Sequence, residues 1–191
     1  SVKVSDKRIN CYSIAGQKDK KHFNLLVDSS PGGPGSKFFE SLKPGDKIAY
    51  IGPYGNMEIK PEDESEDVLF LATGCGLAPF KYMIETLLEQ DTDKRIVLYL
   101  GLDNYENIIL KEYLDDLTEK HSNFSYKISL EKEHEKWDGP TGYITELVKK
   151  DYSNANNCSA YLCGSKFMID DVKNVLVDNG CPPARIYAEQ F

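Results

Sequence analysis

The sequence predicts an α/β protein in which a small antiparallel β domain precedes a doubly wound parallel sheet of five strands. Residues 2–55 alternate apolar and polar side chains between turn residues, which is the pattern of antiparallel strands. From Val68 onwards, short apolar runs alternate with segments of helical periodicity, which indicates parallel strands joined by helices. The first apolar run leads through a glycine turn into a helix, and the rest of the chain is organised around this junction.

The composition limits the kind of protein and its partners. The chain has 191 residues, of which 40% are hydrophobic and 11% aromatic, enough for one domain or two small ones with a sizeable core. A formal net charge of -8 argues against nucleic acid or an anionic membrane surface as a partner, and no apolar stretch is long enough for a membrane span. The five cysteines are odd in number and contain no C-x-x-C motif, so we expect no disulfide framework, no metal site and a cytoplasmic location.

The N-terminal domain is expected to contain strands at residues 8–15, 23–28 and 46–51. A loop of glycine and proline, residues 31–36, opens onto a short helix with Ser36 as its predicted N-cap. This loop is either a second phosphate site or a flexible connection within a hairpin.

The segment 60–67 is acidic, contains proline and lacks apolar residues. It separates the alternating pattern from the βαβ pattern, which places the domain boundary there. We therefore predict a β domain over residues 1–60, a linker over 61–67 and a nucleotide-binding domain over 68–191.

The central junction combines a buried strand, a glycine turn and a helix. Residues 68–72 form an uninterrupted apolar run, as expected of a central parallel strand. Gly74 and Gly76 allow positive φ and close approach of a ligand, and Pro79 suits the first turn of the helix that continues from Phe80. The free amides of that turn suit a diphosphate, although a glycine pair can also simply close a turn.

The remaining apolar and periodic segments complete the sheet. The expected strands are residues 95–100, 124–130, 159–163 and 185–189, and the expected helices are residues 108–121, 142–150 and 166–179. In the strand order 3-2-1-4-5 the first and fourth strands are neighbours, and ligands bind in the crevice at their carboxyl ends. The fourth strand ends in Cys163 and Gly164, so Cys163 is either a functional side chain in this crevice or a small core residue.

Several motifs resemble, in order, those of the ferredoxin-NADP reductase family. They cover nearly the whole chain and consist of Tyr12-Ser13, Gly33-Pro34-Gly35-Ser36, Gly52-Pro53-Tyr54-Gly55, the turn from Thr73 to Pro79, the segment from Cys163 to Met168, and Glu189-Gln190-Phe191. Each motif is weak to moderate alone, but six in the family's order make chance agreement improbable.

The resemblance implies an FAD site and a NAD(P)H site. On the flavin side it places the Tyr12 ring against the isoalloxazine, the Ser13 hydroxyl near N5, Gly35 and Ser36 at the pyrophosphate, and Phe191 stacked on the ring. The residues that it assigns to the nicotinamide nucleotide are Thr73, Gly74, Gly76, Pro79, Ser129, Cys163, Gly164 and Met168. Glu189 matches an acidic residue near the reaction centre, so the implied catalytic group is Ser13, Cys163, Glu189 and Phe191.

Two departures from the family pattern matter. The arginine that precedes the tyrosine in the family and neutralises flavin phosphate is Asn10 here, with Arg8 close by and on the same side only if the strand is regular. Members that use NADPH carry an arginine beside serine after the third strand, whereas here Ser129 is followed by Leu130 and Glu131. The acidic residues Asp103, Glu106, Glu131, Glu133 and Glu135 would repel a 2′-phosphate, which favours NADH.

The resemblance thus implies a flavin-dependent NAD(P)H oxidoreductase that passes hydride to FAD and electrons to a protein acceptor. The chain contains no iron-sulfur motif, so we expect the acceptor to be another redox protein or domain. The alternative is a non-catalytic NAD(H)-binding module or one component of a larger redox complex.

Only eleven residues precede Tyr12, whereas family members carry about half of the flavin-binding barrel before this tyrosine. We therefore expect a partial antiparallel β-barrel. It would belong to a fragment of a longer chain, or be completed by an upstream segment, a partner or a second copy, and it would hold flavin weakly.

Overall fold

The structure is a computed structural model, which describes residues 1–19, 21–61, 63–90 and 92–190. The N-terminal part contains two antiparallel hairpins, β1 (Val2–Ser5) with β2 (Arg8–Asn10), and β3 (Ile14–Asp19) with β4 (His22–Leu25). The expected strand over residues 8–15 is therefore two strands, with Tyr12 and Ser13 in the connection between them. These short antiparallel strands fit a partial barrel.

Residues 46–51 do not form the expected strand. Tyr50 makes one isolated antiparallel bridge with Val2, so the segment runs along β1 without a regular ladder. Gly45 and Gly52 bracket the segment with φ values of 95° and 140°. The segment between these two glycines is extended, but among the described residues it pairs with β1 at this bridge alone.

Helix α1 (Pro34–Ser41) follows the glycine and proline loop, but it begins two residues before the predicted N-cap. Its N-cap is Gly33, and Pro34 occupies the first helical position, where a missing N–H costs nothing. The prediction that Ser36 caps this helix was wrong, because Pro34 already has the φ that starts a helix. Ser36 lies in the first turn and is buried.

The five-stranded parallel sheet has the predicted strand order. Its strands are β5 (Asp67–Thr73), β6 (Arg95–Leu102), β7 (Phe124–Leu130), β8 (Cys158–Gly164) and β9 (Ile186–Gln190), arranged as β7-β6-β5-β8-β9. Every neighbouring pair is parallel, so the order in sequence is 3-2-1-4-5. The first and fourth strands of the domain are therefore neighbours, as the sequence predicts.

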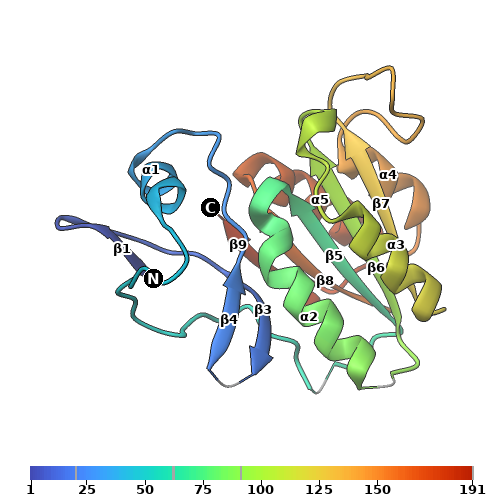
Figure 1. The fold of residues 1–191 in the computed structure, drawn as a ribbon. Helices are drawn as coiled ribbons and strands as arrows, with labels where there is room; N and C mark the ends of the chain where they lie inside the picture. The colour runs from blue at the N-terminus through green and yellow to red at the C-terminus, as the bar shows by residue number, and fades with distance from the viewer. Residues whose placement is uncertain (20, 62, 91, 191) are drawn as a thin grey trace.

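Helices cover both faces of this sheet (Figure 1). One face carries α2 (Leu77–Glu89) and α3 (Lys111–Lys120), and the other carries α4 (Ile144–Asp151) and α5 (Lys166–Asp178). Three short 3-10 turns lie in the connections, at Gly74–Gly76, Tyr105–Asn107 and Pro183–Arg185. Within the described residues, every helix is too short or too polar to cross a membrane.

The β domain contacts the α/β domain through β3 and through the segment that connects the domains. The Tyr82 hydroxyl of α2 donates to Gln17 Oε1 of β3 over 3.1 Å, and β3 lies beside α2 in Figure 1. The Lys60 amide donates to the Tyr161 hydroxyl of β8 over 3.2 Å. These contacts bring the β domain against the sheet that carries the candidate nucleotide site.

Candidate functional site

The carboxyl ends of β5 and β8 meet at the switch point of the sheet. Ala72 lies opposite Cys163 in the parallel register, and Thr73 and Gly164 end the two strands. The Ser165 amide donates to Thr73 Oγ1 over 3.1 Å. This bond ties together the two backbones between which open α/β sheets bind their ligands.

Gly164 must be glycine at this point. Its φ is 154°, and a Cβ atom there would stand 2.1 Å from Thr73 Oγ1 and 2.9 Å from Met168 Cε. The Ser165 hydroxyl accepts a hydrogen bond from the Met168 amide over 3.3 Å and so caps α5. Met168 itself is buried against the face covered by α4 and α5. Gly164 therefore lets the end of β8 pack directly against the Thr73 side chain, and the Met168 side chain packs against Gly164 as well.

The glycine turn after β5 leads into α2 as predicted, although only one of its glycines uses positive φ. Gly74 has φ 50°, whereas Gly76 is in the right-handed helical conformation with φ -59° and ψ -14°. Pro79 is buried in the first turn of α2. The amino end of α2 therefore follows directly from the switch point, where the positive end of the helix dipole favours negative charge.

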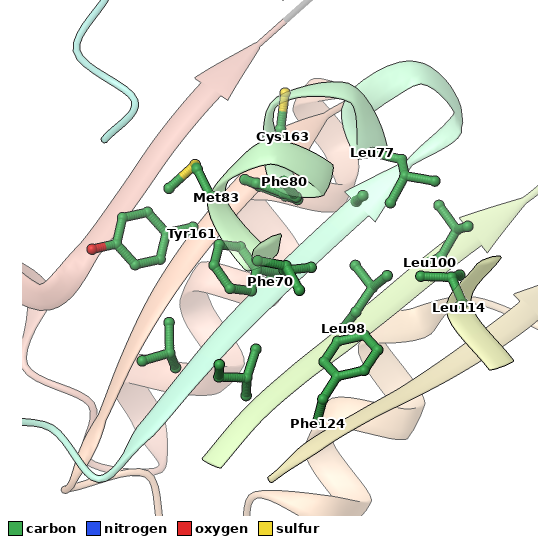
Figure 2. Packing of buried hydrophobic residues seen from close by; sticks show 14 of the residues in the cluster. Phe70, Leu77, Phe80, Met83, Leu98, Leu100, Leu114, Phe124, Tyr161 and Cys163 are labelled. Carbon is green, nitrogen blue, oxygen red and sulfur yellow. The ribbon is translucent and has the colours of Figure 1, made fainter. Parts of the chain in front are cut away.

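Cys163 is buried at the end of β8. Only 3% of the residue is exposed, and it lies at one end of the cluster that contains Phe70, Phe80 and Tyr161 (Figure 2). Burial first, and the Glu189 carboxylate second, raise the pKa of the Cys163 thiol to about 12. The thiol is therefore neutral at physiological pH, so it does not act as a thiolate nucleophile.

Cys75 links the glycine turn to the β domain, and sequence reasoning missed this contact. Burial first, and then the Asp28 carboxylate, raise the pKa of the Cys75 thiol. The two residues are 47 positions apart in the printed sequence, so no local pattern relates them. Asp28 shows that the loop after β4 faces the switch point.

The C-terminal candidates are described only in part. Glu189 is exposed on β9 and lies opposite Cys163 in the parallel register. Its carboxylate therefore borders the same strand end as the thiol. Phe191, the predicted stacking residue, lies outside the residues that the structure describes.

Ser129 is fully buried at the end of β7, and its hydroxyl donates to the Gly142 carbonyl over 2.6 Å. In this arrangement it fixes the connection between β7 and α4. Its predicted contact with the nucleotide stays a prediction.

The flavin-side candidates gather at the amino end of α1. The Tyr12 ring packs edge-on against Phe39 of α1, with centroids 4.9 Å apart, and a Cβ on Gly35 would stand 2.4 Å from the Tyr12 hydroxyl. Gly35 and Ser36 are buried, yet within the described ranges their amides have no acceptor. Ser13 is half-buried in the connection after Tyr12. Buried amides without acceptors at a helix start fit an anionic ligand such as a diphosphate.

The loops after β6 and β7 carry an aromatic stack that the sequence analysis missed. The rings of Tyr105 and His134 lie 4.4 Å apart and are nearly parallel, and His134 Nε2 is 3.7 Å from Glu106 Oε1. The Glu131 amide donates to the Leu102 carbonyl over 2.8 Å, which holds the start of the second loop against the end of β6. Acidic residues of both loops are thereby brought to the same edge of the sheet.

Comparison with known proteins decides the family. The family described as "Oxidoreductase FAD-binding domain" matches residues 1–59, and "Oxidoreductase NAD-binding domain" matches residues 70–174. The chain belongs to the ferredoxin-NADP reductase family. It therefore combines the FAD-binding and NAD-binding oxidoreductase domains of that family, in the order that the motifs predict.

Similar proteins support the same assignment over almost the whole chain. One component of the Na(+)-translocating NADH-quinone reductase of Psychrobacter cryohalolentis is 30% identical over 207 aligned residues, which cover 99% of this chain and 50% of that protein. The corresponding component in Idiomarina loihiensis is 28% identical with the same coverage. The chain thus spans about half the length of the curated relatives that it matches.

Solved structures share the fold. The cytochrome P450 reductase GcoB of Amycolatopsis has a TM-score of 0.86 and 25% identity, covering 94% of this chain and 55% of that one. A variant of ferredoxin-NADP+ reductase from Plasmodium falciparum, in complex with 2′P-AMP, has a TM-score of 0.79 and 19% identity, covering 100% of this chain and 80% of that one. The second likeness concerns the fold alone.

Proposed function

We propose that this chain is the NADH-oxidising part of a flavoprotein reductase, in which NADH binds at the switch point between β5 and β8. The observation that carries this proposal is the contact at the two strand ends, where Thr73 accepts a hydrogen bond from the Ser165 amide across Gly164. Open α/β sheets bind their ligands where such strand ends meet, so we place the nicotinamide ring beside the ends of β5 and β8. FAD, when bound, would supply the redox chemistry, which is hydride acceptance from NADH and single-electron transfer to an acceptor.

The chain's own residues orient the two cofactors. The amino end of α1, with the buried Gly35 and Ser36 amides, holds the flavin diphosphate, and the Tyr12 ring lies against the isoalloxazine. Ser13 is the candidate for a place near the flavin N5. Phe191, which lies outside the described residues, keeps its predicted role of stacking on the flavin ring. The neutral Cys163 thiol, at the end of β8, limits how close the nicotinamide ring comes to the flavin. Glu189 lies beside it at the end of β9 and borders the reaction centre.

NADH is the preferred nucleotide in this proposal. Glu131 and Asp103 follow the ends of the neighbouring strands β7 and β6, where they would repel a 2′-phosphate. Lys127, one of the nearby cations, is already paired with Asp151 at 2.6 Å. The names of the similar curated relatives, which are components of NADH-quinone reductases, support the same preference.

The electron acceptor is a redox protein or domain outside this chain. The relatives support this class of partner, because their names describe one component of a larger reductase or a reductase of a cytochrome P450. Reduction of a panel of ferredoxins, flavodoxins, cytochromes and quinones would identify the acceptor class.

We place the protein in the cytoplasm, since all five cysteines are free thiols, as in a reducing compartment. We place the domain boundary at residues 61–67, between the two family matches.

The rival is a nucleotide-binding module without its own redox turnover. Anaerobic addition of NADH to the purified protein, supplied with excess FAD because the partial barrel is expected to hold flavin weakly, separates the two. The reductase shows a flavin absorbance band that bleaches, whereas the module binds NADH and either binds no FAD or keeps the band unchanged. The second result would refute the proposed function.

A further inference from the structure

Three side chains in and after β2 form a connected row. Arg8 Nε donates to Asn10 Oδ1 over 3.0 Å, and Asn10 Nδ2 donates to the Tyr12 hydroxyl over 3.2 Å. Alternate residues of a strand share one face, and the first of these bonds shows that Arg8 and Asn10 do so here. The row therefore carries a guanidinium towards Tyr12.

The far end of this row touches the first turn of α1. A Cβ on Gly35 would stand 2.4 Å from the Tyr12 hydroxyl and 2.8 Å from Asn10 Nδ2, so only glycine fits between them and the helix. The first turn of α1 carries no acidic side chain, and its Gly35 amide is buried without an acceptor among the described residues. Unpaired donors in a buried position, with no anion supplied by the protein, indicate that a ligand supplies it.

The charge of Arg8 is available to such a ligand. Within the described part of the chain, no carboxylate lies within ion-pair distance of its guanidinium, whereas the neighbouring Lys3 pairs with Asp6 at 3.1 Å. Among the described residues, Asn10 bonds the Nε of Arg8 and no residue bonds its terminal nitrogens, so these can contact a phosphate. The alternative is that Arg8 is a solvated surface residue that binds no ligand, since it is exposed.

We infer that Arg8, held in place by Asn10, provides the positive charge that binds the phosphate groups of the flavin at the amino end of α1. This inference rests on the proposed function. It explains how a chain with Asn10 two positions before Tyr12, where the family has arginine, still balances the flavin's negative charge. Asn10 then acts as a positioning residue, because its amide bridges the guanidinium and the tyrosine hydroxyl.

The test compares flavins with and without phosphate. The complete protein, freed of flavin, is titrated with riboflavin, FMN and FAD, and binding is followed by flavin fluorescence. Arg8→Gln should weaken FMN and FAD binding about tenfold, the size of one partly exposed charge-assisted hydrogen bond, and leave riboflavin binding unchanged. Asn10→Leu should shift FMN and FAD in the same direction, because it releases the guanidinium.

Lys7→Gln is the matched control, since it removes the same charge from the adjacent turn and should leave all three affinities unchanged. Thermal unfolding of each variant checks that the fold is kept. If Arg8→Gln binds FAD as the unchanged protein does, or loses riboflavin to the same extent, the inference is wrong while the proposed function stands. If the unchanged protein binds no FAD, both are wrong.

Discussion

Thr73 and Ser165 are 92 residues apart in sequence, and the Ser165 amide donates to Thr73 Oγ1 over 3.1 Å where β5 and β8 end. Gly164 lies between them, with its missing Cβ in the place that the Thr73 hydroxyl occupies. The width of the crevice at the switch point therefore depends on a glycine at position 164.

Gly164→Ala should both destabilise the protein and abolish tight NADH binding. A side chain at the φ of 154° found here costs about 1–3 kcal/mol, and the methyl group would also displace Thr73. Gly45→Ala is the control, since Gly45 has φ 95° but open space around it. Gly45→Ala should lower the thermal stability only by the free energy of placing a side chain at positive φ, and it should bind NADH as the unchanged protein does. Equal NADH affinity in the two variants would contradict the role of the close approach at Gly164.

Cys163→Ala should slow flavin reduction by NADH while nucleotide affinity stays within a few-fold, because the buried side chain sets the approach of the ring more than it adds contact area. Cys158→Ala removes a thiol that is equally buried at the other end of β8, so both variants should lose about 1 kcal/mol of stability. Only Cys163→Ala should change the stopped-flow rate. An unchanged rate would show that Cys163 is core packing alone.

The raised pKa of Cys163 predicts its reactivity. A thiol with a pKa of about 12 is protonated throughout the neutral range, so its alkylation by iodoacetamide should stay slow past the ordinary thiol pKa of about 8.5. Exposed Cys11 should be alkylated first at every pH, which peptide mass spectrometry of the time course can measure. Fast labelling of Cys163 at neutral pH would show that the thiol is neither buried nor neutral.

The acidic residues that follow β6 and β7, among them Asp103 and Glu131, predict the nucleotide preference. We expect a higher kcat/KM for NADH than for NADPH, and Glu131→Gln should raise kcat/KM for NADPH about fivefold with little change for NADH, because one repulsive charge is removed. Glu119→Gln, on the exposed side of α3, should change neither value. A preference for NADPH in the unchanged protein would contradict the charge argument.

The sheet was predictable because its signals are local. Continuous apolar runs with helices between them determine a parallel sheet, and the observed order follows the predicted one from β7 to β9. The run at residues 46–51 has a strand-like pattern too, but regular pairing depends on a partner strand, and within the described residues this run makes one isolated bridge with β1.

The site was predictable only where a motif carries it. The turn from Thr73 and the strand end at Gly164 follow from glycine and from topology. The contacts of Cys75 with Asp28 and of Tyr105 with His134 depend on side-chain placement that no periodicity encodes. At Ser129 the motif suggests a nucleotide contact, and the structure adds a bond from its hydroxyl to the Gly142 carbonyl that the motif does not predict.

The central claim is that NADH bound at the switch point delivers hydride to flavin held by the same protein. Anaerobic stopped-flow mixing of the flavin-loaded protein with NADH, and with NADH deuterated at the transferred position of C4, tests it most directly. We predict single-turnover bleaching of the flavin band that is slower with deuterated NADH. A flavin band that stays unbleached at saturating NADH would contradict the account.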